Sequence, residues 1–205
     1  MRQGKAAAAK MPRREEPREE RSARERLLAA ANDLFYHRGI RSVGIDEVIA
    51  AADVAKMSLY RSFPSKDELV AAYLRERDRL YWDWWDGVMA RHPEAPHEQF
   101  TALFRSLARR TTRPDYRGCP FTNAATEFPE PDHPGRAVAV ANKRELRRRL
   151  RDLVKAIGAR DAESLADQLV LLFEGTYSSG QTFGTSGPAH RVAEAAEALL
   201  AAQLA

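Results

Sequence analysis

Apolar residues recur every three or four positions along most of this chain, which is the spacing of helices that bury one face. The pattern predicts helices at about residues 22–38, 45–52, 55–63, 66–91, 97–112, 120–128, 135–157, 162–183 and 188–204. Glycine or proline follows several of these segments, as expected where a helix ends: Gly39, Pro64, Pro93 and Gly158. No stretch alternates with a period of two over the length of a strand, so we expect an all-α protein of about nine helices.

Residues 45–63 have the pattern of a helix-turn-helix, in which two short helices are joined by a tight turn. Ile45 and Val48 in the first helix, and Leu59 and Phe63 in the second, are expected to face the protein interior. A unit of this kind lays its second helix in the major groove of DNA.

The outer side of the second helix carries the side chains that such a function needs. At about 100° per residue, Lys56, Met57, Tyr60 and Arg61 fall within an arc of roughly 140°. Arg61 or Lys56 can pair with guanine, and Met57 can contact a thymine methyl group. Tyr60 and Lys66 are suited to phosphates, Lys66 because it lies in the first turn of the next helix.

The distribution of charge along the chain supports a DNA-facing N-terminal region. Residues 1–21 carry seven basic and four acidic side chains, residues 22–66 carry seven and five, and the remainder carries 19 and 20. The positive excess therefore lies at the end that holds the helix-turn-helix, as a phosphate-facing surface requires. Residues 1–21 are poor in large apolar residues, and we expect them to form a disordered basic tail.

Other compositional features limit the class of protein. No apolar run approaches the ~20 residues that cross a bilayer, and no apolar segment of a secretory signal follows the N-terminal basic residues. The single cysteine, Cys119, excludes an intramolecular disulfide and fits a reducing cytoplasm. We therefore expect a cytoplasmic protein with no membrane partner.

The N-terminal region resembles the signature of the TetR (tetracycline-repressor-type) transcriptional regulators. The resemblance covers about residues 24–69 and is carried by Phe35, Gly39, Ile45, Val48, Ala52, Val54, Leu59, Tyr60, Phe63, Lys66 and Leu69. It implies that Tyr60 and Lys66 contact phosphates, and that Lys56, Met57 and Arg61 lie where bases are read. The full DNA-contact set that we predict is Gly44, Lys56, Met57, Ser58, Tyr60, Arg61 and Lys66.

The resemblance also implies an architecture and a function. Residues 22–67 would form a three-helix DNA-binding domain, and residues 68–205 a larger helical domain for ligand binding and dimerisation. Helices near 162–183 and 188–204 would pair with a second copy of the chain. The implied function is that of a homodimeric repressor, without enzymatic activity, which releases a palindromic operator on double-stranded DNA when a small-molecule effector binds.

Three departures from the family pattern occur around the turn. Asp53 and Ala55 stand where the family usually has glycine and serine, so Ala55 supplies no oxygen to cap the second helix. Val43 and Gly44 replace the usual hydroxyl residue before the first helix. Met57, where glycine is common, makes the reading surface bulkier. We expect an altered sequence preference, and a helical module that has lost DNA recognition and binds proteins or ligands remains the alternative function.

A ligand cavity is expected among the middle helices. Residues 118–127 resemble a Gly-Cys-Pro…Asn…Glu stretch found in a subset of the family, including regulators linked to multidrug resistance. Aromatic walls with a few polar groups suit a metabolite-sized molecule. The candidate ligand-binding residues are Tyr81, Trp84, Trp85, Phe104, Cys119, Phe121, Asn123, Glu127 and Tyr177.

A structural interpretation of the same residues stays open. The aromatic residues would then fill the core, Asn123 would cap backbone groups, and Glu127 would pair with a nearby arginine. The basic residues of the segment 143–151 are interpreted as a solvated helix face, because Leu146, Leu150 and Leu153 form an apolar stripe beside them.

Catalysis and metal binding are less well supported. A thiol nucleophile needs an adjacent base, and nothing in the sequence fixes His133 or His92 near Cys119. Five scattered histidines and one cysteine show no spacing typical of metal ligands. We therefore expect no catalytic residues, no metal and no cofactor.

Overall fold

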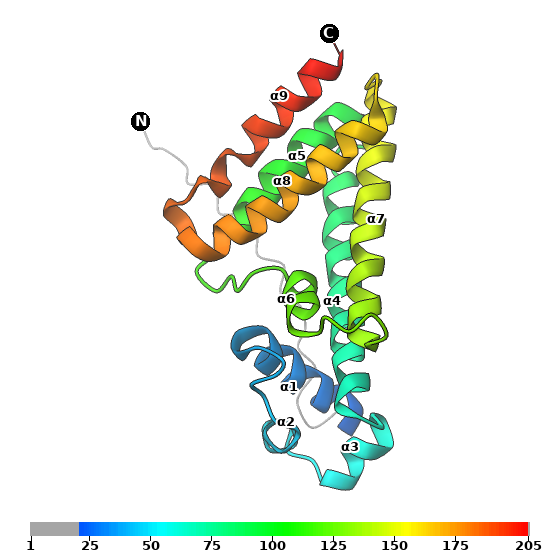
Figure 1. The fold of residues 1–205 in the computed structure, drawn as a ribbon, viewed down its shortest axis with the longest axis vertical. Coiled ribbons are helices and arrows are strands. Elements are labelled where there is room, and N and C mark those ends of the chain that lie inside the picture. Colours follow the sequence, from blue (N-terminus) through cyan, green and yellow to red (C-terminus); the bar gives the residue numbers. More distant parts are fainter. Residues whose placement is uncertain (1–20, 205) are drawn as a thin grey trace, which may run out of the picture.

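The computed structural model describes residues 21–204, so the predicted tail lies outside the described residues apart from Arg21. Regular structure within 21–204 is entirely helical, as predicted (Figure 1). The elements are α1 (Ala23–Arg38), α2 (Ile45–Ala52), α3 (Lys56–Ser62), α4 (Lys66–Met89), α5 (Pro96–Thr111), α6 (Pro120–Glu127), α7 (Pro134–Ile157), α8 (Ala162–Phe183), η1 (Gly184–Ser186), η2 (Pro188–Arg191) and α9 (Val192–Leu204).

The N-terminal helices form because their apolar faces meet, and the start of α1 is also capped by a side chain. The Ser22 hydroxyl accepts a hydrogen bond from the Glu25 backbone N–H, and the Glu25 carboxylate accepts from the Ser22 N–H at 2.8 Å. Inward faces of α1, α2 and α3 bury Leu27, Val48 and Leu59 completely. These helices pack beside the first turns of α4 at one end of the molecule (Figure 1).

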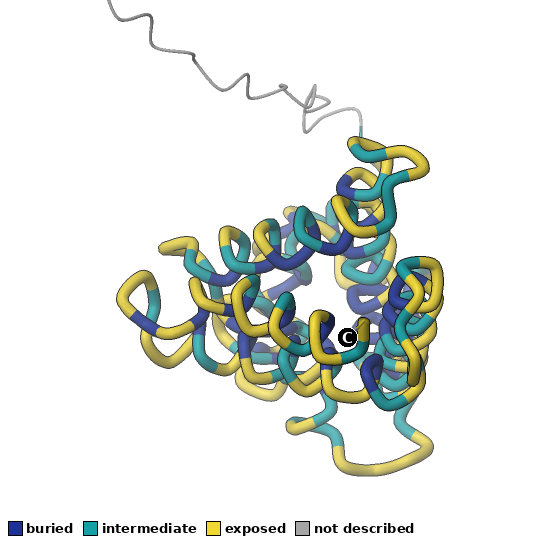
Figure 2. Tube along the Cα trace, turned by 90° about the horizontal axis from the view of Figure 1, so that it is seen from above, coloured by how far each residue is buried: buried dark blue, intermediate teal, exposed yellow. Residues whose placement is uncertain are grey.

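Two long helices connect this end of the molecule to the other. α4 and α7 lie side by side, and a part-buried polar contact joins them. Asp78 of α4 accepts hydrogen bonds at 2.9 Å from both the Asn142 amide of α7 and the Trp82 indole. α5, α8 and α9 form the far end, and α6 lies between that end and α1 (Figure 1). Seen from above, buried residues occupy the sides of the helices that face one another (Figure 2).

α8 approaches α5 unusually closely at Gly180. A Cβ atom at this position would lie 2.4 Å from the backbone oxygen of Thr111, so no larger residue fits without moving a helix. This contact fixes the distance between α8 and the end of α5, where the loop to α6 begins.

Two helix ends differ from the sequence-based expectation. α4 ends at Met89 instead of Arg91, because Arg91 and His92 donate to the carbonyls of Val88 and Met89 three residues back. The segment predicted to begin the last helix forms the 3-10 turn η2, and α9 begins only at Val192. None of the helices within 21–204 combines the length and apolar content that a bilayer span requires.

Candidate functional site

The outer face of α3 is open to solvent and carries large side chains. Met57 is 63% exposed and Tyr60 46% exposed, although both are residues that usually seek burial. Arg61 beside them is also exposed, and it forms no ion pair with any residue of the described chain. Leu59 points the opposite way and is fully buried. The face therefore offers apolar, aromatic and cationic groups together, as expected for a surface that reads DNA.

The turn before α3 contains a residue in the left-handed conformation. Asp53 has φ 53° and ψ 58°, a left-handed conformation that aspartate tolerates better than most residues. Ala55 precedes α3 without any side-chain cap. Gly44 at the start of α2 likewise has no hydroxyl to cap the helix. The Glu47 carboxylate stabilises this end instead, because it accepts the Gly44 N–H at 3.0 Å and pairs with Arg38 at 2.6 Å. The Gly44 hydrogen bond is the main cause of a lowered pKa for Glu47.

An acidic partner for Lys56 was not anticipated from the sequence. The Lys56 ammonium group lies 3.0 Å from the Asp46 carboxylate of α2, and this hydrogen bond raises the pKa of Lys56. Both side chains are exposed. Asp46 thus neutralises one of the cations on this face. Ser58 and Lys66 are half-buried at the edges of this surface, and Gly44 is exposed.

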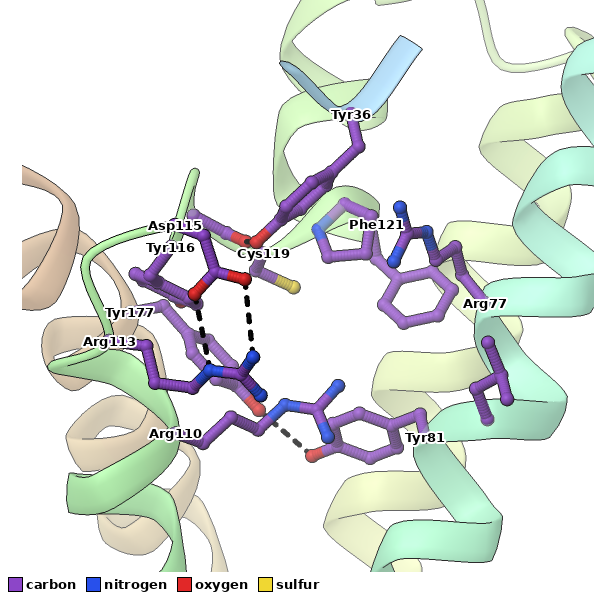
Figure 3. Close-up of a pocket in the computed structure, with 13 residues that line it drawn as sticks. Tyr36, Arg77, Tyr81, Arg110, Arg113, Asp115, Tyr116, Cys119, Phe121 and Tyr177 are labelled. Atoms are coloured by element: carbon purple, nitrogen blue, oxygen red, sulfur yellow. Dashed lines mark hydrogen bonds and ion pairs between the residues drawn. The ribbon is translucent and has the colours of Figure 1, made fainter. Parts of the chain in front are cut away.

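A cavity of about 350 Å³ lies between α4, the end of α5, α6 and α8 (Figure 3). Four of the predicted ligand-binding residues line it, namely Tyr81, Cys119, Phe121 and Tyr177. Sequence reasoning missed most of its polar wall, which consists of Tyr36, Arg77, Arg110, Arg113, Asp115 and Tyr116. Its volume is at the lower end of the range for small-molecule sites, about 300–1,000 Å³.

The structure does not place the other three predicted aromatic residues in the lining of this cavity. The Trp84 indole donates to the Ser106 hydroxyl at 2.9 Å, so its polar edge is turned toward α5. Trp85 is buried with its ring centroid 6.0 Å from that of Trp82. Phe104 is fully buried, and its ring meets the Phe173 ring edge-on at 5.2 Å. Their place in the ligand site was expected from aromatic character alone, which also suits the core.

Asn123 and Glu127 lie on the side of α6 that faces α1. Asn123 donates to the backbone oxygen of Arg117 at 3.0 Å, which matches the structural interpretation of this residue. The Glu127 carboxylate accepts the backbone N–H groups of Ile40 at 3.1 Å and Arg41 at 2.6 Å. Neither residue belongs to the lining of the cavity formed by Tyr81 and Cys119, and Glu127 instead connects α6 to the loop after α1.

Burial governs the protonation of the cavity's phenols. The hydroxyl groups of Tyr81 and Tyr177 are 2.9 Å apart, and desolvation raises the pKa of both. Desolvation raises the pKa of Tyr116 in the same way. The three phenols therefore remain neutral hydrogen-bonding groups at physiological pH.

The cavity's thiol has a cationic neighbour. Cys119 is buried, with its sulfur 3.3 Å from the Lys143 ammonium group, which pairs with Glu174 at 2.5 Å. Burial lowers the pKa of Lys143, but Cys119 and Glu174 together outweigh it, and the net shift is upward. The pair of Lys143 and Glu174 is thus close to self-neutralising.

Tyr36 and Arg77 join this cavity to α1. The Tyr36 hydroxyl accepts the Arg117 N–H at 3.0 Å and donates to the Gly118 carbonyl at 3.3 Å. Arg77 of α4 stacks over the Tyr36 ring at 4.4 Å and donates to the Asn32 carbonyl of α1 at 3.0 Å. Both residues line the cavity. Their role depends on contacts between distant parts of the chain, for which the local sequence holds no signal.

The histidines considered as catalytic bases have other partners. The His133 ring stacks on Phe128 at 3.9 Å and accepts the Gly135 N–H, while His92 lies 3.3 Å from Glu98. Across residues 21–204, no group of three or more metal-ligating side chains comes together. None of these histidine contacts involves the thiol of Cys119, whose polar neighbour is the Lys143 ammonium group.

Most of the basic residues of α7 are paired with carboxylates. Arg147 bonds Asp167 at 2.5 Å, Arg148 bonds Glu145 at 2.6 Å, and Arg149 bonds Asp86 at 2.5 Å. Neighbouring carboxylates therefore neutralise these arginines, in keeping with the solvated helix face that the sequence suggested.

Comparison with known proteins relates both halves of the chain to one group. The family model described as bacterial regulatory proteins, tetR family, matches residues 27–73, and that of the tetracyclin repressor-like C-terminal domain matches residues 96–196. The crystal structure of SCO4454, a TetR-family transcriptional regulator from Streptomyces coelicolor, is similar with a TM-score of 0.84 and 33% identity, over 88% of this chain and 95% of that one.

Two further similarities extend over most of the chain. A regulator of the same type from Streptomyces avermitilis, sav143, gives a TM-score of 0.79 at 32% identity, covering 89% of this chain and 98% of that one. The HTH-type transcriptional regulator YjdC of Escherichia coli is 25% identical over 174 residues, which is 83% of this chain and 91% of that protein.

Proposed function

Because this chain belongs to the TetR family of DNA-binding transcriptional regulators, we propose that it is a repressor that leaves its operator when a small molecule occupies the cavity. Such a protein acts in the cytoplasm as a homodimer, and its ligand and its operator oppose each other's binding to the same extent. No catalytic step is part of this function.

DNA binding is assigned to α3 and the residues around it. Lys56, Met57 and Arg61 read base edges in the major groove, and Tyr60 and Lys66 hold phosphates. The exposure of Met57, Tyr60 and Arg61 supports this assignment. A dimer places two such helices about 34 Å apart, so a palindromic operator is the expected target.

One contact carries the ligand-responsive part of the proposal: Tyr36 belongs to α1 and also lines the cavity. A ligand there touches a residue whose hydroxyl group is bonded to the backbone of Arg117 and Gly118. Arg77 bridges the same two regions through Asn32. Occupation of the cavity therefore favours one placement of α1 relative to α6, and α1 carries α2 and α3 with it.

The dimer interface is assigned to α8 and α9. Leu171 is 72% exposed and Phe183 57% exposed on α8, and Leu204 is exposed on α9. Apart from Met57 and Tyr60, these are the large apolar side chains that the described chain leaves open to solvent. Pairing of α8 and α9 with their copies would form a four-helix bundle and cover them. Leu171→Glu should shift the protein to a monomer in sedimentation velocity, and an unchanged dimer would contradict this interface.

The test of the whole proposal is DNA binding measured by fluorescence anisotropy on fragments of the gene's own promoter. Affinity should depend on sequence, and it should fall steeply as salt rises because phosphate contacts release counterions. Binding to no fragment would refute a repressor and favour a helical module that has lost DNA recognition. Arg61→Ala should weaken specific binding by about 5- to 150-fold, the scale of ~1–3 kcal/mol for one base contact.

A further inference from the structure

Three guanidinium groups reach the wall of the cavity, whereas one carboxylate does (Figure 3). Arg77 comes from the α4 side, Arg110 from the last turn of α5, and Arg113 from the loop that follows. Asp115 is the acidic group of the lining. A small cavity with this excess of fixed positive charge favours an anion and disfavours a cation.

The lone carboxylate of the lining, Asp115, neutralises Arg113 and leaves the other two arginines without an acidic partner in the lining. Both oxygens of Asp115 accept hydrogen bonds from Arg113, each at 3.2 Å, and this exposed pair lies at the solvent side of the cavity. Arg77 donates one N–H to the Asn32 carbonyl, and its buried Nε has no hydrogen-bond partner among the described residues. The cavity therefore retains donors that no acidic side chain of its lining uses.

Arg110 is the group best placed to meet a ligand. Its guanidinium group stacks over Trp84 at 5.0 Å and lies 5.9 Å from the Tyr81 ring centroid. No carboxylate within residues 21–204 pairs with it. The C-terminal end of α5 favours a positive charge at this position. That preference is shared by Arg109 next to it, which is exposed and lies outside the cavity.

The remaining wall is apolar and aromatic. Phe121 is a buried residue of this wall, and its ring centroid lies 6.1 Å from that of Tyr81 in an edge-to-face arrangement. Leu80 completes this part of the lining. Burial keeps the phenols of Tyr81, Tyr116 and Tyr177 neutral, so they add hydrogen-bonding groups without adding negative charge. A flat ring fits against these surfaces, and an attached carboxylate fits the guanidinium of Arg110.

We propose that the effector is a small aromatic carboxylate, bound through its anionic group by Arg110 with Arg77 nearby, and through its ring by Phe121 and Tyr81. This inference rests on the proposed function, in which the cavity is the effector site. Glu127, the acidic residue that the sequence assigned to the pocket, is committed to backbone groups of the loop after α1 and gives no counterion for a cationic ligand.

The test compares a matched pair of probes, naphthoate and its neutral amide, titrated calorimetrically into the full-length protein without DNA. The two have nearly the same shape and differ in charge. Naphthoate should bind about tenfold or more tightly than naphthamide, the scale of one hydrogen bond to a charged group. Arg110→Gln should remove this preference, and the matched change Arg109→Gln should keep it.

Each result decides the inference separately from the proposed function. Equal or tighter binding of naphthamide, or no binding of either probe, would overturn it, as would a carboxylate preference that survives Arg110→Gln. Circular dichroism checks that Arg110→Gln is folded. The ratio of acid to amide affinity in the unchanged protein tests the inference even if this variant does not fold. Operator binding is measured on the same preparation by anisotropy. Retained DNA binding with no carboxylate preference rejects the ligand class alone, while lost DNA binding with an intact preference rejects the repressor alone.

Discussion

Replacing Glu127 by glutamine tests the junction between α6 and the DNA-binding helices. The carboxylate accepts two backbone hydrogen bonds, from Ile40 at 3.1 Å and from Arg41 at 2.6 Å. A hydrogen bond to a charged acceptor contributes about 1.5–3 kcal/mol. The amide of glutamine has a single acceptor oxygen, so Glu127→Gln leaves one backbone N–H without a partner. We expect the junction to lose about 2 kcal/mol, which multiplies its open population about thirtyfold because a factor of ten corresponds to ~1.4 kcal/mol.

Native-state hydrogen exchange of the Ile40 and Arg41 amides measures this opening directly. Both amides should exchange about thirtyfold faster in Glu127→Gln, while amides of α7 stay unchanged. Glu130→Gln is the matched control, because Glu130 lies 3.8 Å from the Arg41 side chain and accepts no hydrogen bond from these two amides. An acceleration below threefold, or the same acceleration in both variants, would refute the role that we assign to Glu127.

Four other substitutions have expected outcomes. Gly180→Ala should destabilise the fold by about 1–3 kcal/mol in urea denaturation, because its methyl group would lie 2.4 Å from a backbone oxygen of α5. Gly87→Ala, where nothing lies within 4 Å of the added methyl group, should instead stabilise α4 by up to ~1 kcal/mol, and the reverse order would contradict the packing. Asp46→Asn should free the Lys56 cation to face DNA and remove a negative charge beside it, so operator affinity should rise with a steeper salt dependence; weaker binding would count against this. Arginine hydrogen bonds lower the pKa of Glu145 to about 2, so its contribution to stability is present above pH ~4.5 and lost as the pH falls toward 2. Thermal melts of Glu145→Gln across that range should show a flatter acid dependence than the unchanged protein, and parallel curves would exclude it.

The helices were predictable because their ends are marked by local chemistry. Ser22 and Ser65 cap α1 and α4, and Pro96 and Pro120 begin α5 and α6, each within a residue or two of the expected position. The 3-10 turn at Pro188–Arg191 was not foreseen, because proline starts a 3-10 turn as readily as an α-helix and the sequence does not tell them apart.

The cavity was predictable only in part. An aromatic residue on a helix looks the same in sequence whether it lines a cavity or fills the core, so Tyr81 and Trp85 received the same interpretation although only Tyr81 borders the space. Arg110 gave no signal, because a basic residue at a helix end is usual on a surface. Tyr36 and Arg77 join the wall through contacts with distant residues, and such contacts exist only once the chain has folded.

Tyr36 lies within residues 27–73, which match the tetR-family model, yet its side chain is part of the wall of the cavity. Under the proposed function, a chimaera that takes α1–α3 from a relative without this tyrosine would acquire a new operator and a damaged effector site together. Transplanting DNA specificity into this chain therefore requires the donor segment to keep Tyr36. The first three helices of this regulator therefore cannot be exchanged without also changing the cavity.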